Sequence, residues 1–94
     1  MRISEKEKLA IISAVKKFDG DAKIWLFGSR ADDKQKGGDI DIAALSTNIS
    51  RKDKHEIIYN IQKQIGEQKI DFLVSADGKK PIFRMATESG VRIG

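Results

Sequence analysis

Three aspartates lie inside segments that otherwise read as buried β-strands. Asp39 and Asp41 flank Ile40 in the apolar run over residues 37–45, and Asp71 interrupts a second apolar run. An ionised carboxylate removed from water needs a compensating cation, and carboxylate oxygens are ligands that Mg²⁺ prefers. Because side chains alternate along a strand, we expect Asp39 and Asp41 on one face and Ile40 on the other, in the core. The pattern predicts a magnesium site.

The chemistry of such a site follows from the number of carboxylates. Two on one face, joined by a third from a neighbouring strand, can hold two Mg²⁺ ions about 3.5 to 4 Å apart. One ion would lower the pKa of an attacking hydroxyl, and the other would carry a triphosphate and its leaving pyrophosphate. We expect Asp39 and Asp41 to bind both ions. Asp71 is expected to bind the ion nearest the acceptor and to act as the base.

A second motif could hold the phosphates. Gly28 and Ser29 follow a short apolar strand predicted over residues 23–27. Glycine permits close backbone approach, and Ser29 at a helix N-terminus offers a hydroxyl and an amide, with Arg30 adding charge. The segment is neither a Walker loop nor a dinucleotide-binding fingerprint. Its specificity comes from Gly38 and the paired aspartates that follow about ten residues later. Together these features predict a magnesium-dependent nucleotidyltransferase.

The elements that must position these residues alternate between helix and strand. Turn residues and apolar periodicity predict strands over residues 23–27, 39–45 and 69–75, a short helix over 29–33, and longer helices after Ser4, Ser50 and Lys80, with residues 91–93 as an edge strand. The fold class is therefore α/β or α+β, with a small mixed β-sheet flanked by helices.

Each of the two longest helices has a start signal and an apolar stripe. Ser4 with Glu7, and Ser50 with Asp53, have the spacing of a capping box. The stripe of the first helix is predicted to contain Leu9, Ile11, Ile12, Val15 and Phe18, and that of the second Ile57, Ile58, Ile61 and Ile65.

Length and composition limit the alternatives. The 94 residues form one small domain, residues 1–94, and leave no room for a second substrate-gripping domain. The absence of cysteine excludes a disulfide framework and a thiolate zinc site, and no membrane span or signal peptide is visible. We expect a cytoplasmic protein. The net charge of +4 is spread among acids, which is only a weak indication of nucleic acid binding.

The motifs resemble those of the DNA polymerase β-like nucleotidyltransferase superfamily. The segment Gly28-Ser29-Arg30-Ala31 is similar to the Gly-Ser signature of that superfamily, Gly38-Asp39-Ile40-Asp41 to its paired metal aspartates, and Asp71 to its third carboxylate. The closest resemblance is to the minimal nucleotidyltransferase (MNT) proteins, over almost the whole chain. It implies the catalytic palm alone, with nucleotide bound at Gly28, Ser29, Arg30 and Gly38 and two Mg²⁺ ions at the three aspartates. One departure is Asp32-Asp33, where the family often has a glycine.

The resemblance also implies a partner. Proteins of this kind pair with a HEPN-domain toxin in a hetero-oligomer and transfer AMP from ATP to one of its tyrosines, which makes the nucleotidyltransferase an antitoxin. Two other functions stay open. A catalytically weak relative could neutralise its HEPN partner by masking, and the basic balance alone would allow a nucleic-acid-binding domain. EF-hand and glycosyltransferase uses of Asp-x-Asp do not fit the flanking alanines or the chain length.

Overall fold

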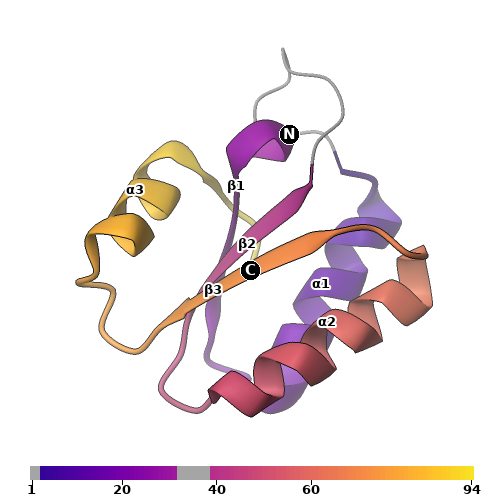
Figure 1. The fold of residues 1–94 in the computed structure, drawn as a ribbon, viewed down its shortest axis with the longest axis horizontal. Coiled ribbons are helices and arrows are strands. Elements are labelled where there is room, and N and C mark those ends of the chain that lie inside the picture. Colours follow the sequence, from indigo (N-terminus) through magenta and orange to yellow (C-terminus); the bar gives the residue numbers. More distant parts are fainter. Residues whose placement is uncertain (1–2, 32–38) are drawn as a thin grey trace.

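The chain folds as a mixed β-sheet between helices. The computed structural model describes residues 3–31 and 39–94. Within these residues the elements are α1 (Glu5–Phe18), β1 (Lys23–Phe27), the 3₁₀ helix η1 (Gly28–Ala31), β2 (Ile40–Leu45), α2 (Arg51–Ile65), β3 (Ile70–Ser75), α3 (Pro81–Ser89) and β4 (Val91–Arg92). The strand order is β3-β2-β1-β4 (Figure 1). β2 pairs antiparallel with β1 and parallel with β3, and β1 pairs antiparallel with β4. The predicted α+β class is confirmed.

The two faces of the sheet are covered differently. Helices α1 and α2 lie on one face and α3 on the other (Figure 1). Ile40 and Ile42 of β2 are fully buried in the main core with Ile57 of α2. The smaller α3 layer packs Phe83 and Ala86 on Ala43 of the same strand. Because β2 alternates, its odd-numbered positions face α3 and its even-numbered positions face α1 and α2.

The start signals of the helices form as the sequence predicts. Ser4 accepts a hydrogen bond from the Glu7 amide and the Glu7 carboxylate accepts one from the Ser4 amide, which makes a complete capping box. Ser50 and Asp53 form the same box at α2. At α3, Pro81 occupies the first turn, where its missing amide hydrogen breaks no intrahelical hydrogen bond.

One predicted core residue is wrong. Leu9 is 57% exposed, whereas the buried residues of α1 are Ala10, Ile11, Ala14 and Val15. Helix α1 packs against α2 as well as the sheet, so its buried face is rotated towards the two alanines. Small side chains at these positions allow close approach of two helices, which a count of large apolar residues does not detect. The isoleucine stripe of α2 is confirmed, with Ile57 and Ile61 fully buried.

Two shorter elements also agree with prediction. The helix expected at residues 29–33 is a 3₁₀ turn over Gly28–Ala31, and residues 32 and 33 lie outside the described residues. The expected edge strand at the end of the chain is β4. None of the described helices has the length and hydropathy needed to cross a membrane.

Candidate active site

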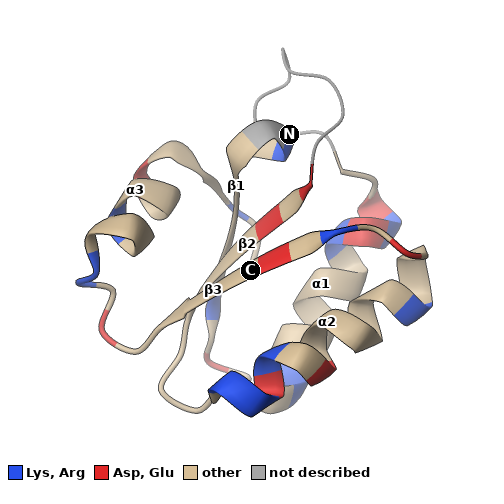
Figure 2. Cartoon of the chain, in the orientation of Figure 1, with Lys and Arg blue, Asp and Glu red and all other residues tan. Residues whose placement is uncertain are grey.

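Asp41 and Asp71 are direct neighbours on two parallel strands. In the β2–β3 register Asp41 is paired with Asp71, although 30 positions separate them in the chain. Paired residues on adjacent strands lie about 4.8 Å apart. Figure 2 shows acidic segments on both β2 and β3, in agreement with this register. The sequence-based expectation that a third strand would bring Asp71 to the paired aspartates is met for Asp41.

The pair lies on the face that α3 covers only in part. Asp41 shares its side of β2 with Ala43, against which Phe83 of α3 packs. One step towards the start of β2, Asp41 pairs with Phe27 at the border of this apolar layer, and Asp41 is half-buried while Asp71 is exposed. The carboxylates therefore stay accessible to a ligand on the sheet face, beside the end of the apolar core.

The backbone of Gly28 lies against the side chain of Asp41. Gly28 has a φ of 70°, a conformation that L side chains rarely adopt. A Cβ built at Gly28 would overlap Oδ2 of Asp41 and lie 3.1 Å from its Cγ. The positive φ and the contact with the Asp41 carboxylate together favour glycine at the turn after β1. The close backbone approach predicted for Gly28 is an approach to the side chain of Asp41.

The surroundings of Asp41 disfavour its charge. Burial raises the pKa of Asp41 to about 6, and a hydrogen bond shared with Asp71 acts in the same direction. The negative charges of Asp71 and Asp39 add to the rise in the pKa, and Lys69 opposes it. A carboxyl group with such a perturbed pKa beside a second carboxylate is typical of functional sites.

Asp39 influences the site electrostatically, and its carboxylate is paired with Lys69. Its Oδ2 atom lies 3.5 Å from Nζ of Lys69, in an ion pair whose two side chains are both substantially exposed. Within residues 3–31 and 39–94, no group of three acidic, histidine or cysteine side chains is arranged to hold a metal ion. Asp41 and Asp71 form the core of the candidate site, and Asp39 lies close enough to influence the pKa of Asp41.

The remaining predicted phosphate-binding residues are only partly described. Arg30 Nη2 donates to Oε1 of Gln68 at 3.3 Å, and Gln68 Nε2 donates to Oε2 of Glu7 at 3.1 Å. This chain of contacts ties η1 to the start of α1. The backbone of Ser29 belongs to η1, and its side chain is not among the parts of the chain that the structure describes. Gly38 also lies outside the described residues.

Sequence reasoning missed Lys69 and Gln68. Lys69 neutralises Asp39, and Gln68 receives Arg30. The signal for Lys69 was its position two residues before Asp71, which places both side chains on the same side of an extended segment. No comparable signal exists for Gln68, because its contact with Arg30 spans 38 positions in the chain.

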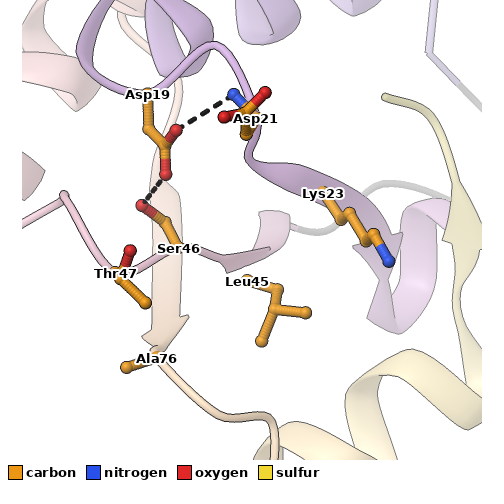
Figure 3. A pocket seen from close by; sticks show the side chains of 7 residues that line it. All are labelled: Asp19, Asp21, Lys23, Leu45, Ser46, Thr47 and Ala76. Carbon is orange, nitrogen blue, oxygen red and sulfur yellow. Dashed lines mark hydrogen bonds between the residues drawn. The ribbon is translucent and has the colours of Figure 1, made fainter.

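A second polar pocket lies at the other end of the strands. It measures about 220 Å³ and is lined in part by Asp19, Asp21 and Ser46 (Figure 3). The buried Asp19 carboxylate accepts a hydrogen bond from Ser46 Oγ at 2.5 Å and one from the Asp21 amide at 3.0 Å. Ser46 Oγ in turn accepts from the amide of Ile49 at 3.2 Å. These contacts satisfy the buried side chains of Asp19 and Ser46, and the cluster joins the end of α1 to the turn after β2.

The fold and the carboxylate pair define a class of protein. A mixed sheet with acidic residues on adjacent strands, beside a glycine turn, agrees with the nucleotidyltransferase palm that the motifs resemble. A family model described as polymerase beta, nucleotidyltransferase matches residues 10–93, and the chain therefore belongs to this family. The matched range contains Gly28, Asp41 and Asp71. The chain is thus a nucleotidyltransferase domain, which makes it a transferase in general terms. The search of curated proteins found no match.

Proposed function

We propose that this chain transfers a nucleoside monophosphate, AMP from ATP, to a hydroxyl group of a protein. The observation that carries the proposal is the Asp41–Asp71 pair in register on an accessible sheet face, against the backbone of Gly28. Membership of the nucleotidyltransferase family supports the reaction class. The choice of ATP and of a protein acceptor is supported by the resemblance to the MNT proteins.

The donor set fits magnesium. Carboxylate oxygens are hard ligands, and a divalent cation between Asp41 and Asp71 would replace their shared proton and neutralise the two negative charges. Asp41 and Asp71 would hold the metal, with Asp39 as a further ligand after release from Lys69. When bound, Mg²⁺ supplies charge neutralisation of the triphosphate and a lower pKa for the acceptor hydroxyl.

The residues of the chain have separate roles in the transfer. The acceptor oxygen attacks the α-phosphorus of the nucleotide, the new P–O bond forms, and the bond to the β-phosphate bridging oxygen breaks, so that pyrophosphate leaves. The hydroxyl proton passes to the carboxylate of Asp71, which is exposed and therefore reachable by an acceptor. Asp41 would hold the metal, and the Gly28 turn leaves only its backbone beside that carboxylate, where the phosphates would lie. Positioning and electrostatics provide most of the catalysis.

The acceptor we propose is a tyrosine of a HEPN-domain toxin, which would make this chain an antitoxin. Support comes from the resemblance to MNT proteins. An accessible carboxylate pair at the sheet face can receive a side chain carried on another protein. A complex of the two chains is part of this proposal.

A second candidate function is neutralisation by masking, without transfer. The observation that favours it is the engagement of Asp39 with Lys69, which leaves two rather than three carboxylates together among the described residues. In that case the chain would inhibit its partner by steric contact alone.

Intact-mass spectrometry separates the two functions. The partner protein is incubated with this chain, ATP and MgCl₂, and its mass is compared with that of a sample lacking ATP. Transfer predicts a gain of one or more AMP units on the partner, and masking predicts inhibition of the partner without a mass change. An unmodified, uninhibited partner would contradict both.

The matched variants assign the chemistry to the pair. Asp71→Asn should bind MgATP but transfer no AMP, since the acceptor proton has no carboxylate to receive it. Glu67→Gln removes a nearby exposed acid outside the site and should transfer at the parental rate. Equal activity of Asp71→Asn and the parent would remove Asp71 from the mechanism.

A further inference from the structure

A groove runs along the outer edge of β3, beside the N-terminal half of α2. Its larger part, about 460 Å³, is lined by side chains that include Ile58, Ile70 and Phe72. A smaller adjoining part, about 260 Å³, continues past Val74 to Lys80. Arg51 and Lys54 line both parts, so the two form one continuous channel, which we call the β3 groove.

One wall of the groove is an unpaired strand edge. The amide of Ile40 donates to the Lys69 carbonyl, and the amide of Ser46 donates to the Ser75 carbonyl, each at 3.0 Å. Both groups of a strand residue point to the same side and successive residues alternate, so odd-numbered positions of β3 face β2. The amides and carbonyls of Ile70, Phe72 and Val74 therefore point outwards. No described residue bonds to them, and β3 is the end of the described sheet.

The opposite wall is basic. Figure 2 shows Lys and Arg gathered at the start of α2, and Arg51, Lys54 and His55 from this segment line the groove, with Lys80 at its far end. None of these four forms an ion pair with another residue in the part of the chain that the structure describes. The nearby acid Asp53 is already engaged, because its carboxylate accepts the Ser50 amide in the capping box. The charge of this wall is thus available to an anion.

We propose that the β3 groove binds an extended, acidic polypeptide segment as an additional β-strand. The outward amides and carbonyls of Ile70, Phe72 and Val74 would pair with the backbone of the segment, and its acidic side chains would meet Arg51 and Lys54. The apolar floor at Ile58 and Phe72 lies on the same side as the basic wall, so the methylene groups of these acidic side chains would pack on it. A strand edge and an apolar floor favour a polypeptide over a nucleic acid, whose backbone has no donors and acceptors at strand spacing.

The groove also leads to the candidate active site. Asp71 lines its larger part, so a segment added to β3 would run past the carboxylate that we assign as the proton acceptor. This aspect rests on the proposed function: the docked segment would belong to the acceptor protein and carry its hydroxyl. The groove then selects the acceptor, whereas Asp41 and Gly28 position the nucleotide.

Fluorescence anisotropy tests the binding with a labelled peptide of alternating glutamate and valine that contains one central tyrosine. The parent should bind it, and Arg51→Glu/Lys54→Glu should bind at least about tenfold more weakly because two attractive charges become repulsive. Lys16→Glu/Lys17→Glu makes the same change in net charge at exposed positions of α1 outside the groove, and should bind nearly as the parent. Equal losses in both double variants would overturn the site.

A second probe tests the strand pairing itself. The same peptide, N-methylated at alternate residues along one edge, keeps its charge and side chains but cannot donate to β3 at those positions. It should bind at least about tenfold more weakly than the unmodified peptide. Equal binding of both peptides, or binding of an oligouridine in preference to the peptide, would overturn the inference.

Peptide binding at the β3 groove and AMP transfer can be tested separately. Binding of the unmodified peptide without any transfer of AMP to a protein supports the β3 groove and counts against the proposed function. Transfer to a partner at the parental rate by Arg51→Glu/Lys54→Glu, with no peptide binding by the parent, supports the function and overturns the groove. Calorimetry of MgATP binding to the same double variant should give the parental affinity, since neither residue belongs to the nucleotide site.

Discussion

Asp41 is held where its own charge is disfavoured. Burial, the shared hydrogen bond and the adjacent charge of Asp71 raise its pKa to about 6. Without a cation, ionisation of Asp41 therefore lowers the free energy of unfolding. A carboxylate pair of this kind has little value for stability, and its placement is understandable through ligand binding.

Replacement of Asp41 by asparagine should separate activity from stability. Asp41→Asn is expected to abolish transfer. In EDTA it should raise the melting temperature above pH 6, where the parental carboxyl is ionised in the folded state. The sign follows from the raised pKa: the parent loses stability as pH rises from the usual value of 3.8 through about 6, and the variant lacks this loss. Thermal melts across this range measure it, and a variant less stable than the parent above pH 6 would contradict the assignment.

Gly28 is expected to tolerate no side chain. Gly28→Ala places a Cβ at positive φ, which costs about 1 to 2 kcal/mol, and the new atom overlaps the Asp41 carboxylate. We expect both lower stability in urea unfolding and loss of transfer. Gly20→Ala is the matched control, because Gly20 has no positive φ and no atom within 4 Å of an added Cβ. Similar losses in the two variants would argue against a special role for the Gly28 turn.

At the scale of elements, the buried face of α1 differs from the apolar stripe predicted for this helix, because Ile11 is buried and Leu9 is exposed. Ile11→Ala should cost about 2 to 5 kcal/mol because Ile11 is fully buried, whereas Leu9→Ala should change stability by less than about 0.5 kcal/mol. Chemical denaturation of the two variants provides the measurement. A large cost at Leu9 would indicate that the helix is rotated relative to the described packing.

The Asp19–Ser46 contact joins two elements in a pH-dependent way. The hydrogen bond from Ser46 holds the pKa of Asp19 below its usual value of 3.8, helped by the Asp21 amide. Stability from a depressed carboxyl pKa is present above 3.8 and is lost as pH falls through the folded value. Ser46→Ala should therefore be less stable than the parent near neutral pH, and the difference should narrow below pH 3.8. A difference that stays constant with pH would exclude the Asp19 carboxylate as the cause.

The sequence was sufficient to predict the elements but not all of their contacts. Capping boxes, strand alternation and Pro81 are local signals, and each corresponds to an observed element boundary. Asp41 and Asp71 could be predicted to meet because both lie in apolar strands joined by a helical crossover. The Asp39–Lys69 ion pair and the Arg30–Gln68 contact depend on how chain segments far apart in sequence pack together. No single-sequence pattern encodes them.

At the scale of the whole molecule, Asp41 and Asp71 lie on strands with different numbers of neighbouring strands. β2 lies inside the sheet between β1 and β3, and β3 is paired on one side only in the described chain. Local opening costs less free energy for elements with fewer hydrogen bonds. We therefore expect Asp71 to be the less firmly held member of the pair.

Amide hydrogen exchange should reveal this difference. The outward amides of Phe72 and Val74 should exchange at least about a hundredfold faster than that of Ile42, which lies in the central strand. Exchange measured by NMR in the absence of nucleotide resolves these positions. Equal protection of the β2 and β3 amides would show that the edge of β3 is covered in solution.

Because Asp71 lies on the edge strand β3, the proposed reaction depends on the pairing of β3 with β2. When β3 opens locally, Asp71 separates from Asp41, and we expect transfer to stop until the strand pairs again. A peptide segment that forms backbone hydrogen bonds with β3 would stabilise the strand. It would raise the fraction of molecules in which Asp41 and Asp71 are adjacent. An acceptor protein that supplies this segment would thereby activate its own modification, and nucleotide turnover without the acceptor would stay low.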